Sequence, residues 1–130
     1  MILGLGCDIV NIERIAKSAD FLERFKLKIM GEDEIDELQN IGEFTYKEFA
    51  CRLAKAYAGK EAFAKALGTG FRHGIFLKDI QVLHNGLGKP EIKISGGAEY
   101  QLKKMSDSPK INISISDDFP YAQAVVIIEE

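Results

Sequence analysis

The feature that most constrains the fold of this chain is an alanine-rich run, residues 53–70, that ends in a glycine turn. Upstream, Thr45 and Glu48 have the spacing of a capping box, which predicts that a helix begins just after Thr45. Gly68 follows the last apolar residue and suits the left-handed position that ends a helix. The sequence therefore predicts one helix of about 22 residues, roughly 33 Å long, around which the other elements are organised.

Two further features concern the surface of this helix. Phe44 and Phe49 lie on either side of the predicted cap and can form a hydrophobic staple. Small side chains recur at i, i+4 spacing and form a narrow stripe, which lets another backbone approach closely. The residues of this stripe are Ala54, Ala58, Ala62 and Ala66.

Charged residues gather near the C-terminal end of the same helix. Glu61 and Lys65 are four residues apart and share one face, with Lys60 beside them. The simplest interpretation is a solvated intrahelical ion pair, which is common on helices. A functional interpretation needs support from elsewhere in the chain, and the N-terminal segment supplies it.

The composition is typical of a soluble globular protein. The chain has 130 residues, 46% of them hydrophobic and 28% charged, so we expect a single domain, residues 1–130, with one core. No apolar run approaches the roughly 20 residues that cross a membrane, and the N-terminus lacks the basic region of a signal peptide. Cys7 and Cys51 are too few for a disulfide framework, which favours the cytoplasm. A net charge of −3 argues against general nucleic-acid binding.

Charge is unevenly distributed along the first third of the chain. Residues 11–28 carry five basic and three acidic side chains, a balance of +2, and include Arg14, Lys17 and Arg24. Residues 31–43 carry six acidic side chains and no basic one, a balance of −6. Opposed blocks of this kind favour a local basic surface on a protein that is acidic overall.

The first third of the chain also contains signals for short elements. Residues 2–8 predict a strand that ends at Asp8, and Asn11 is the expected N-cap of a following helix. Asp20 and Glu23 have capping-box spacing and predict that a second helix begins there. A third, acidic helix is expected before the glycine that precedes the long helix.

The sequence patterns in the second half of the chain predict mainly strands. Partial alternation over residues 76–84 and 91–95, joined by an Asn-Gly turn, predicts a hairpin. A helix is expected over residues 97–105, and two strands over residues 111–116 and 122–128. Hairpins joined by helices predict an α+β fold with a largely antiparallel sheet and one long helix packed on it.

The last predicted strand has a consequence for assembly. Residues 122–128 are almost continuously apolar, which is typical of a strand that is buried on both faces. One layer of helices covers only one side of a sheet in so short a chain. We therefore expect the second face to pack against another subunit.

Two stretches carry recognisable motifs. The first is Gly4-Leu5-Gly6-Cys7-Asp8-Ile9-Val10, and the second is Lys60-Glu61-Ala62-Phe63-Ala64-Lys65-Ala66 followed by Gly68-Thr69-Gly70. Together they resemble the holo-acyl-carrier-protein synthase family of phosphopantetheinyl transferases, whose signatures are G-x-D-[IV] and K-E-A-x-x-K-A with G-T-G. The separation of the motifs, the chain length and the C-terminal residues Ser114-Ile115-Ser116-Asp117 and Tyr121-Ala122 are also similar.

The resemblance implies a Mg²⁺-dependent transfer of 4′-phosphopantetheine from coenzyme A to a serine of acyl carrier protein, in fatty acid biosynthesis. Such a transfer requires mainly positioning and the neutralisation of charge on phosphate oxygens. Asp8 and Glu61 would hold Mg²⁺ and, with Lys65 on a pyrophosphate oxygen, form the catalytic group. Either a metal-bound water or one of the carboxylates could take the serine proton. The cofactor-binding residues would be Lys60, Lys65, Gly68, Thr69 and Gly70.

The resemblance also implies partners. The family is trimeric, and a homotrimer with sites between subunits agrees with the apolar strand at residues 122–128. The helix that begins at Asn11, with Arg14, Lys17 and Arg24, would receive the acidic carrier protein.

Two residues depart from the family pattern. Ala56 stands where many members have an arginine, so Arg52 or Lys55 would have to supply its phosphate contact. Asp117 stands where many members have a histidine, although others have aspartate.

Other interpretations stay open at this stage. Asp8 could simply cap the helix that follows it. A non-catalytic trimeric module that binds nucleotide or carrier protein would keep the fold without needing both carboxylates. A transferase for peptidyl carriers is disfavoured because those members are usually longer. The run Gly86-Leu87-Gly88-Lys89 imitates part of a phosphate loop but is interpreted as a hairpin turn.

Overall fold

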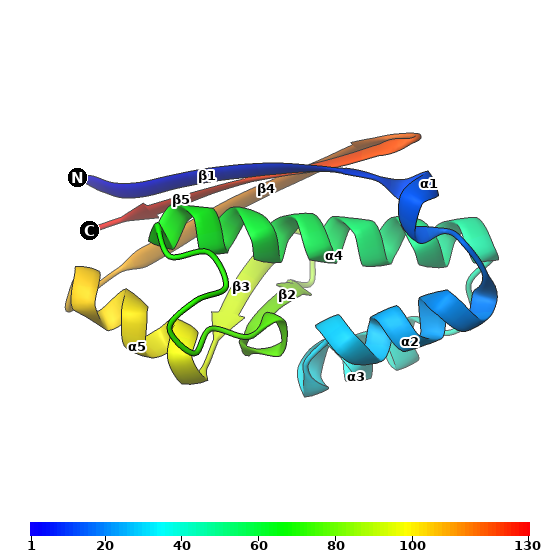
Figure 1. Ribbon diagram of the computed structural model, residues 1–130, viewed down its shortest axis with the longest axis horizontal. Helices are drawn as coiled ribbons and strands as arrows, with labels where there is room; N and C mark the ends of the chain where they lie inside the picture. The colour runs from blue at the N-terminus through cyan, green and yellow to red at the C-terminus, as the bar shows by residue number, and fades with distance from the viewer.

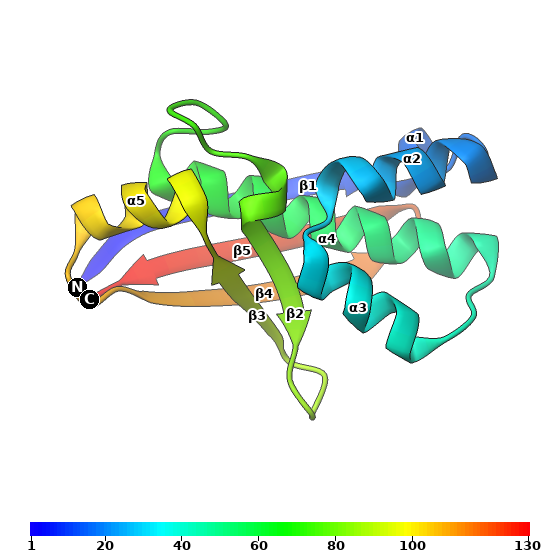
Figure 2. The ribbon, with the colours of Figure 1, turned by 90° about the horizontal axis from the view of Figure 1, so that it is seen from below.

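The long helix α4 (Tyr46–Leu67) lies at the centre of the computed structural model, which describes residues 1–130 (Figure 1). A three-stranded antiparallel sheet packs on one side of α4, in the spatial order β1-β5-β4. Most of the other helices and a two-stranded hairpin lie on its opposite side (Figures 1 and 2). The strands of the large sheet are β1 (Ile2–Asn11), β4 (Lys110–Asp118) and β5 (Tyr121–Glu129).

The layer on the opposite side of α4 contains most of the short elements. They are α2 (Ala19–Ile29), α3 (Glu32–Ile41), the 3₁₀ helix η1 (Leu77–Asp79), β2 (Ile80–His84), β3 (Pro90–Ile94) and α5 (Gly96–Met105). Helix α1 (Ile12–Ile15) is a single turn that leads from β1 toward α2. The predicted α+β class with antiparallel strands is confirmed, although the strands form two sheets. No helix combines the length and the apolar character needed to span a membrane.

The predicted ends of α4 are confirmed. Thr45 Oγ1 accepts a hydrogen bond from the Glu48 backbone at 3.1 Å, and Glu48 Oε1 accepts one from the Thr45 backbone at 3.2 Å. The rings of Phe44 and Phe49 stack with centroids 6.4 Å apart, which is the predicted staple. Gly68 ends the helix at a φ of 81°, in the left-handed region. The helix has 22 residues because both termini carry local signals that act within a few residues.

The alanine stripe of α4 allows β1 to approach its backbone. Built at Gly6, a Cβ would lie 2.0 Å from the carbonyl oxygen of Ala62, and at Gly4 it would lie 2.1 Å from that of Ala66. Any side chain at these two strand positions would therefore collide with the helix backbone. The close approach brings the N-terminal half of β1 against the last turns of α4.

Strand β1 is longer than predicted. It continues past Asp8 to Asn11 because it remains paired with β5 over its whole length, with Asp8 opposite Ala124 and Asn11 opposite Tyr121. Asn11 is still the N-cap of the following turn, since its Oδ1 accepts from the Glu13 backbone at 3.0 Å. Asp8 thus lies within a strand, and the interpretation of Asp8 as a helix cap is wrong.

Helix α2 begins earlier than the sequence predicted. Ser18 is the N-cap of α2, and its Oγ accepts from the Phe21 backbone at 3.0 Å. The Asp20–Glu23 spacing is therefore not a capping box here; Asp20 instead pairs with Arg24 at 3.3 Å. Residues 77–79 also differ from the prediction, because they form the 3₁₀ helix η1 instead of the first part of a strand.

Only one face of β5 is buried within the single chain, and the expected packing of its second face against another subunit stays a prediction. Ala122, Ala124, Val126 and Ile128 are fully buried against the core. The alternate positions face away from α4, where no element of the chain covers the sheet (Figure 1).

Candidate functional site

Two residues from the recognised motifs meet at the junction of β1 and α4. The ammonium Nζ of Lys65 lies 3.0 Å from Asp8 Oδ1 and 3.0 Å from the carbonyl oxygen of Cys7. The Asp8 side chain is 17% exposed and that of Lys65 is 53% exposed, so the pair lies at the edge of the core and in contact with solvent. The hydrogen bond to Asp8 raises the pKa of Lys65, which keeps this side chain cationic.

Glu61 lies one helical turn before Lys65 on the same face of α4. The predicted ion pair between these two residues does not form, because Lys65 turns toward Asp8 instead. Tyr57, one further turn back, interacts with Glu61. Burial, the contact with Glu61 and the charges of Glu61 and Asp8 raise the pKa of the Tyr57 phenol to about 12. Two carboxylates, a cation and a protonated phenol are therefore gathered at one surface.

Sequence reasoning missed Tyr57, although a signal was present. Tyr57, Glu61 and Lys65 follow one another at i, i+4 spacing, which puts all three on one face of a helix. The ring of Tyr57 packs against Phe25 of α2 with centroids 5.4 Å apart. This contact joins the carboxylate site to the helix that carries Arg24.

The glycine turn lies directly beyond this site. Gly68 and Gly70 both have positive φ angles, 81° and 61°, which glycine adopts without steric cost. The Gly70 backbone donates to the Ala64 carbonyl at 3.2 Å, and Thr69 Oγ1 donates to the Gly70 carbonyl at 3.0 Å. The turn is partly exposed and follows Lys65 by one helical turn, so it can border a ligand held there.

Lys60 does not reach this site. Its side chain is fully buried, and its ammonium donates to Glu34 Oε1 at 2.6 Å and to the carbonyl oxygens of Leu77 and Ile80. All three donors are used inside the protein. The prediction of Lys60 as a cofactor-binding residue is therefore incompatible with this structure, because no donor remains for a nucleotide.

The three residues predicted to dock the carrier protein are all exposed and lie in the region of α1 and α2. Arg14 belongs to α1, Lys17 lies between α1 and α2, and Arg24 belongs to α2. Lys17 Nζ lies 5.0 Å from the centroid of Phe21, and Arg24 pairs with Asp20. The helix expected from Asn11 is only one turn long, so these side chains come from three successive segments instead of one helix.

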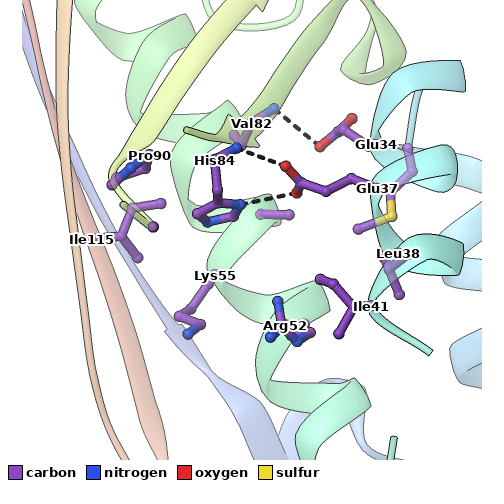
Figure 3. A pocket seen from close by; sticks show the side chains of 13 residues that line it. Glu34, Glu37, Leu38, Ile41, Arg52, Lys55, Val82, His84, Pro90 and Ile115 are labelled. Atoms are coloured by element: carbon purple, nitrogen blue, oxygen red, sulfur yellow. Dashed lines mark hydrogen bonds and ion pairs between the residues drawn. The ribbon is translucent and has the colours of Figure 1, made fainter. Parts of the chain in front are cut away.

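A pocket of about 140 Å³ lies on the other side of α4, between α3, the β2–β3 hairpin and β4 (Figure 3). Arg52, Lys55 and Ala56 of α4 line it, together with His84 of β2 and Glu37 of α3. The Glu37 carboxylate accepts from the His84 backbone at 2.8 Å and lies 2.9 Å from His84 Nδ1. The sequence contained no signal for this contact, because the two residues are 47 positions apart.

The two cations proposed as substitutes for the missing arginine are both at this pocket, beside Ala56. Lys55 Nζ lies 3.6 Å from Asp117 Oδ1 at the end of β4. Arg52 and Glu61 are nine residues apart, or two and a half helical turns, so they project from opposite sides of α4. The pocket and the carboxylate site of one chain therefore face different directions.

The comparisons with known proteins agree with these motifs. Residues 4–124 match the family model described as the 4′-phosphopantetheinyl transferase superfamily. A protein from Erythrobacter litoralis named holo-[acyl-carrier-protein] synthase is 44% identical, over 99% of this chain and 97% of the relative.

Solved structures of the same kind are similar in fold. The crystal structure of holo-[acyl-carrier-protein] synthase from Neisseria meningitidis superposes with a TM-score of 0.83 and 34% identity, covering all of both chains. A holo-(acyl-carrier-protein) synthase from Bacillus anthracis, in complex with CoA (3′,5′-ADP), has a TM-score of 0.74 and 30% identity, over 98% of this chain and 96% of that one.

Proposed function

The chain belongs to the 4′-phosphopantetheinyl transferase superfamily, and from this premise we propose that it transfers 4′-phosphopantetheine from coenzyme A to a serine of acyl carrier protein in a Mg²⁺-dependent reaction. The transfer would release adenosine 3′,5′-bisphosphate and serve fatty acid biosynthesis in the cytoplasm. The observation that carries the proposed site is the meeting of Asp8 with Lys65, one turn from Glu61.

The proposed reaction is a displacement at phosphorus. The serine oxygen forms a bond to the phosphorus that bears the pantetheine arm, and the bond from that phosphorus to the bridging pyrophosphate oxygen breaks. The electron pair of the broken bond leaves with adenosine 3′,5′-bisphosphate. Lys65, half exposed and cationic, would offset the charge on the pyrophosphate oxygens. The serine proton would pass to a carboxylate, Asp8 or Glu61, or to a water.

The donor set fits a Mg²⁺ ion that is shared with the substrate. Mg²⁺ is usually bound through one or two carboxylates plus substrate phosphates. Asp8 and Glu61 offer two carboxylates, and no group of three or more His, Cys, Asp or Glu residues is gathered here. Asp8 and Glu61 would therefore hold the ion, which when bound would neutralise phosphate charge. Mg²⁺ should bind the free protein weakly and bind more tightly when coenzyme A is present.

Other residues would bind the nucleotide. The Gly68–Gly70 turn, partly exposed beside Lys65, would border the coenzyme A phosphates. Arg52 and Lys55 would contact a phosphate at the pocket that Ala56 leaves open. The pocket and Glu61 project from opposite sides of α4, so one coenzyme A molecule that touches both would need two protomers.

An apolar sheet face supports such an assembly, and we propose a homotrimer. Leu5 and Ile9 of β1 are 66% and 63% exposed on the face that no element covers. Ile127 and Val125 of β5 are paired with β1 beside them, opposite Leu5 and Cys7. Exposed apolar patches of this kind mark protein–protein contacts.

The basic residues Arg14, Lys17 and Arg24 would receive the carrier protein. They are exposed, and the contact of Tyr57 with Phe25 brings α2, which carries Arg24, beside the carboxylates. Acyl carrier proteins are acidic, so this surface would attract the carrier and raise its association rate.

The direct test is incubation of the protein with apo acyl carrier protein, coenzyme A and Mg²⁺, followed by intact mass measurement of the carrier. We expect the carrier to gain one phosphopantetheine, and a carrier in which the acceptor serine is replaced by alanine should gain nothing. An unchanged mass of the wild-type carrier would refute the proposed activity and favour a binding module.

A further inference from the structure

The most completely buried charge in the protein belongs to Lys60, which the proposed reaction does not use. Its ammonium donates three hydrogen bonds, to Glu34 Oε1 of α3 and to the carbonyl oxygens of Leu77 and Ile80. The side chains of Lys60 and Glu34 are 0% and 1% exposed. One helix is thus joined at a single point to α3, η1 and the start of β2.

The carboxylate of Glu34 completes this connection. Its Oε1 accepts from the Gly31 backbone at 3.0 Å, and its Oε2 accepts from the Val82 backbone at 3.1 Å. Gln81 Oε1 accepts from the Asp33 and Glu34 backbones at 2.9 and 3.1 Å. Every polar atom of the pair has a partner, so the geometry around Lys60 is specified from several directions.

Burying the Lys60–Glu34 ion pair costs free energy, because both charges lose their contact with water. Burial raises the pKa of Glu34 and lowers that of Lys60, since the interior disfavours both charges. Apolar residues often replace a buried ion pair without loss of stability, so such a pair is weak evidence for a purely stabilising role. Directional bonds, in contrast, can select one arrangement among several that pack equally well.

The rotation of helix α4 about its own axis is an arrangement that such bonds can select. Where it contacts β1, α4 presents small alanines to Gly4 and Gly6, so at this edge the interface sets a close distance without large interlocking side chains. Lys60 and Glu61 are consecutive, so they project about 100° apart around the helix axis. A fixed direction for Lys60 therefore sets the direction of Glu61.

We propose that Lys60, held by Glu34, is a positioning residue that sets the rotation of α4 and so aims Glu61 at the space beside Asp8. The inference rests on the proposed function, because it assigns Lys60 an effect on the phosphate-transfer site. Lys60 touches no substrate; it acts through Glu61.

The test removes both charges together. In the Glu34→Gln/Lys60→Met variant no unpaired charge stays buried, and the glutamine amide can still accept from the Val82 backbone. We expect a folded protein with an unchanged KM for coenzyme A and a kcat reduced by about 10²-fold, the effect of roughly 1 Å of misplacement. The Glu99→Gln/Lys103→Met variant makes the same substitutions in an exposed pair of α5, 2.9 Å apart, and should keep full activity.

A cycle with Glu61→Gln distinguishes positioning from stability. If Lys60 acts through Glu61, adding the paired substitution to Glu61→Gln should lower kcat little further. Calorimetric titration gives a second measurement: Mg²⁺ should strengthen coenzyme A binding in the parent and less so in the paired variant. Full kcat in a folded paired variant, or losses that multiply in the cycle, would overturn the inference.

A conservative variant covers the case in which the paired variant does not fold. Glu34→Asp keeps both charges and withdraws the carboxylate by one methylene, so it should pull Lys60 and lower kcat with KM kept. A folded Glu34→Asp protein with parental kcat would equally overturn the inference. A parent that leaves the carrier unmodified would instead refute the proposed function.

Discussion

Replacement of Gly6 by alanine should disturb both stability and activity, because β1 and α4 touch through their backbones at this point. The added Cβ would lie 2.0 Å from the Ala62 carbonyl oxygen and 2.6 Å from the Ala66 nitrogen. To reach an ordinary contact of 3.4 Å, strand and helix must separate locally by more than 1 Å. Neither group can rotate away, since both belong to the helix backbone.

The magnitude follows from this displacement. Overpacking of a well-packed core typically costs about 1–3 kcal/mol, so the free energy of unfolding should fall by that amount. Asp8 lies two residues along β1 and would move with the strand, away from Lys65 and Glu61. A misplacement of about 1 Å can cost roughly 10²-fold in rate, so kcat/KM should fall by about that factor.

Urea unfolding at fixed protein concentration and the carrier mass assay measure the two effects. Gly86→Ala is the matched control, because a Cβ at Gly86 meets nothing within 4 Å. That control should change the unfolding free energy by less than about 0.5 kcal/mol. A Gly6→Ala protein with parental stability and parental kcat/KM would refute the argument that this close contact aligns the site.

Four further outcomes are expected. Glu61→Gln should lower kcat/KM by about 10²–10³ in the mass assay without loss of folding, and parental turnover at limiting Mg²⁺ would contradict its role. Arg14→Glu with Lys17→Glu should raise the KM for carrier but not for coenzyme A and should weaken the salt dependence; equal salt slopes would mean that these residues only solubilise the protein. The pKa of Tyr57 is raised from 10.0 to about 12, so its contribution to stability is present below pH 10 and lost as pH rises through 12. The parent should therefore lose unfolding free energy more steeply than Tyr57→Phe over this range, and equal slopes in alkaline melts would count against a raised phenol pKa. Ile127→Lys on the uncovered sheet face should dissociate the proposed trimer in light scattering, and an unchanged mass would exclude that face.

Much of the local structure could be predicted from the sequence. The N-cap at Thr45, the phenylalanine staple and the glycine at position 68 are signals that act within one turn of the chain, so the ends of α4 were predicted correctly. The hairpin at Asn85 is of the same kind, since its Oδ1 accepts from the Leu87 and Lys89 backbones. The family motifs likewise singled out Asp8 and Lys65, which are far apart in the sequence and lie 3.0 Å apart in the structure.

Predictions fell short where two local signals competed or where the outcome depended on the rest of the fold. Ser18 and Asp20 both suit an N-cap. The structure uses Ser18, so the helix begins at Ala19. The alternation over residues 76–84 did not reveal the 3₁₀ turn at its start. Apolar character along residues 122–128 indicated burial but could not say which face is covered, because the answer depends on where α4 lies.

The sequence by itself thus determined most of the elements, the caps of the long helix and the motifs that the proposed site uses. Only the tertiary structure decided which charges meet. Lys60 and Lys65 are both lysines on the same helix, yet one is buried against Glu34 and the other is half exposed against Asp8. Their partners are 26 and 57 residues away, and each pairing goes together with one rotation of α4 between its two layers. That rotation depends on contacts between residues far apart in the sequence, which no local pattern encodes.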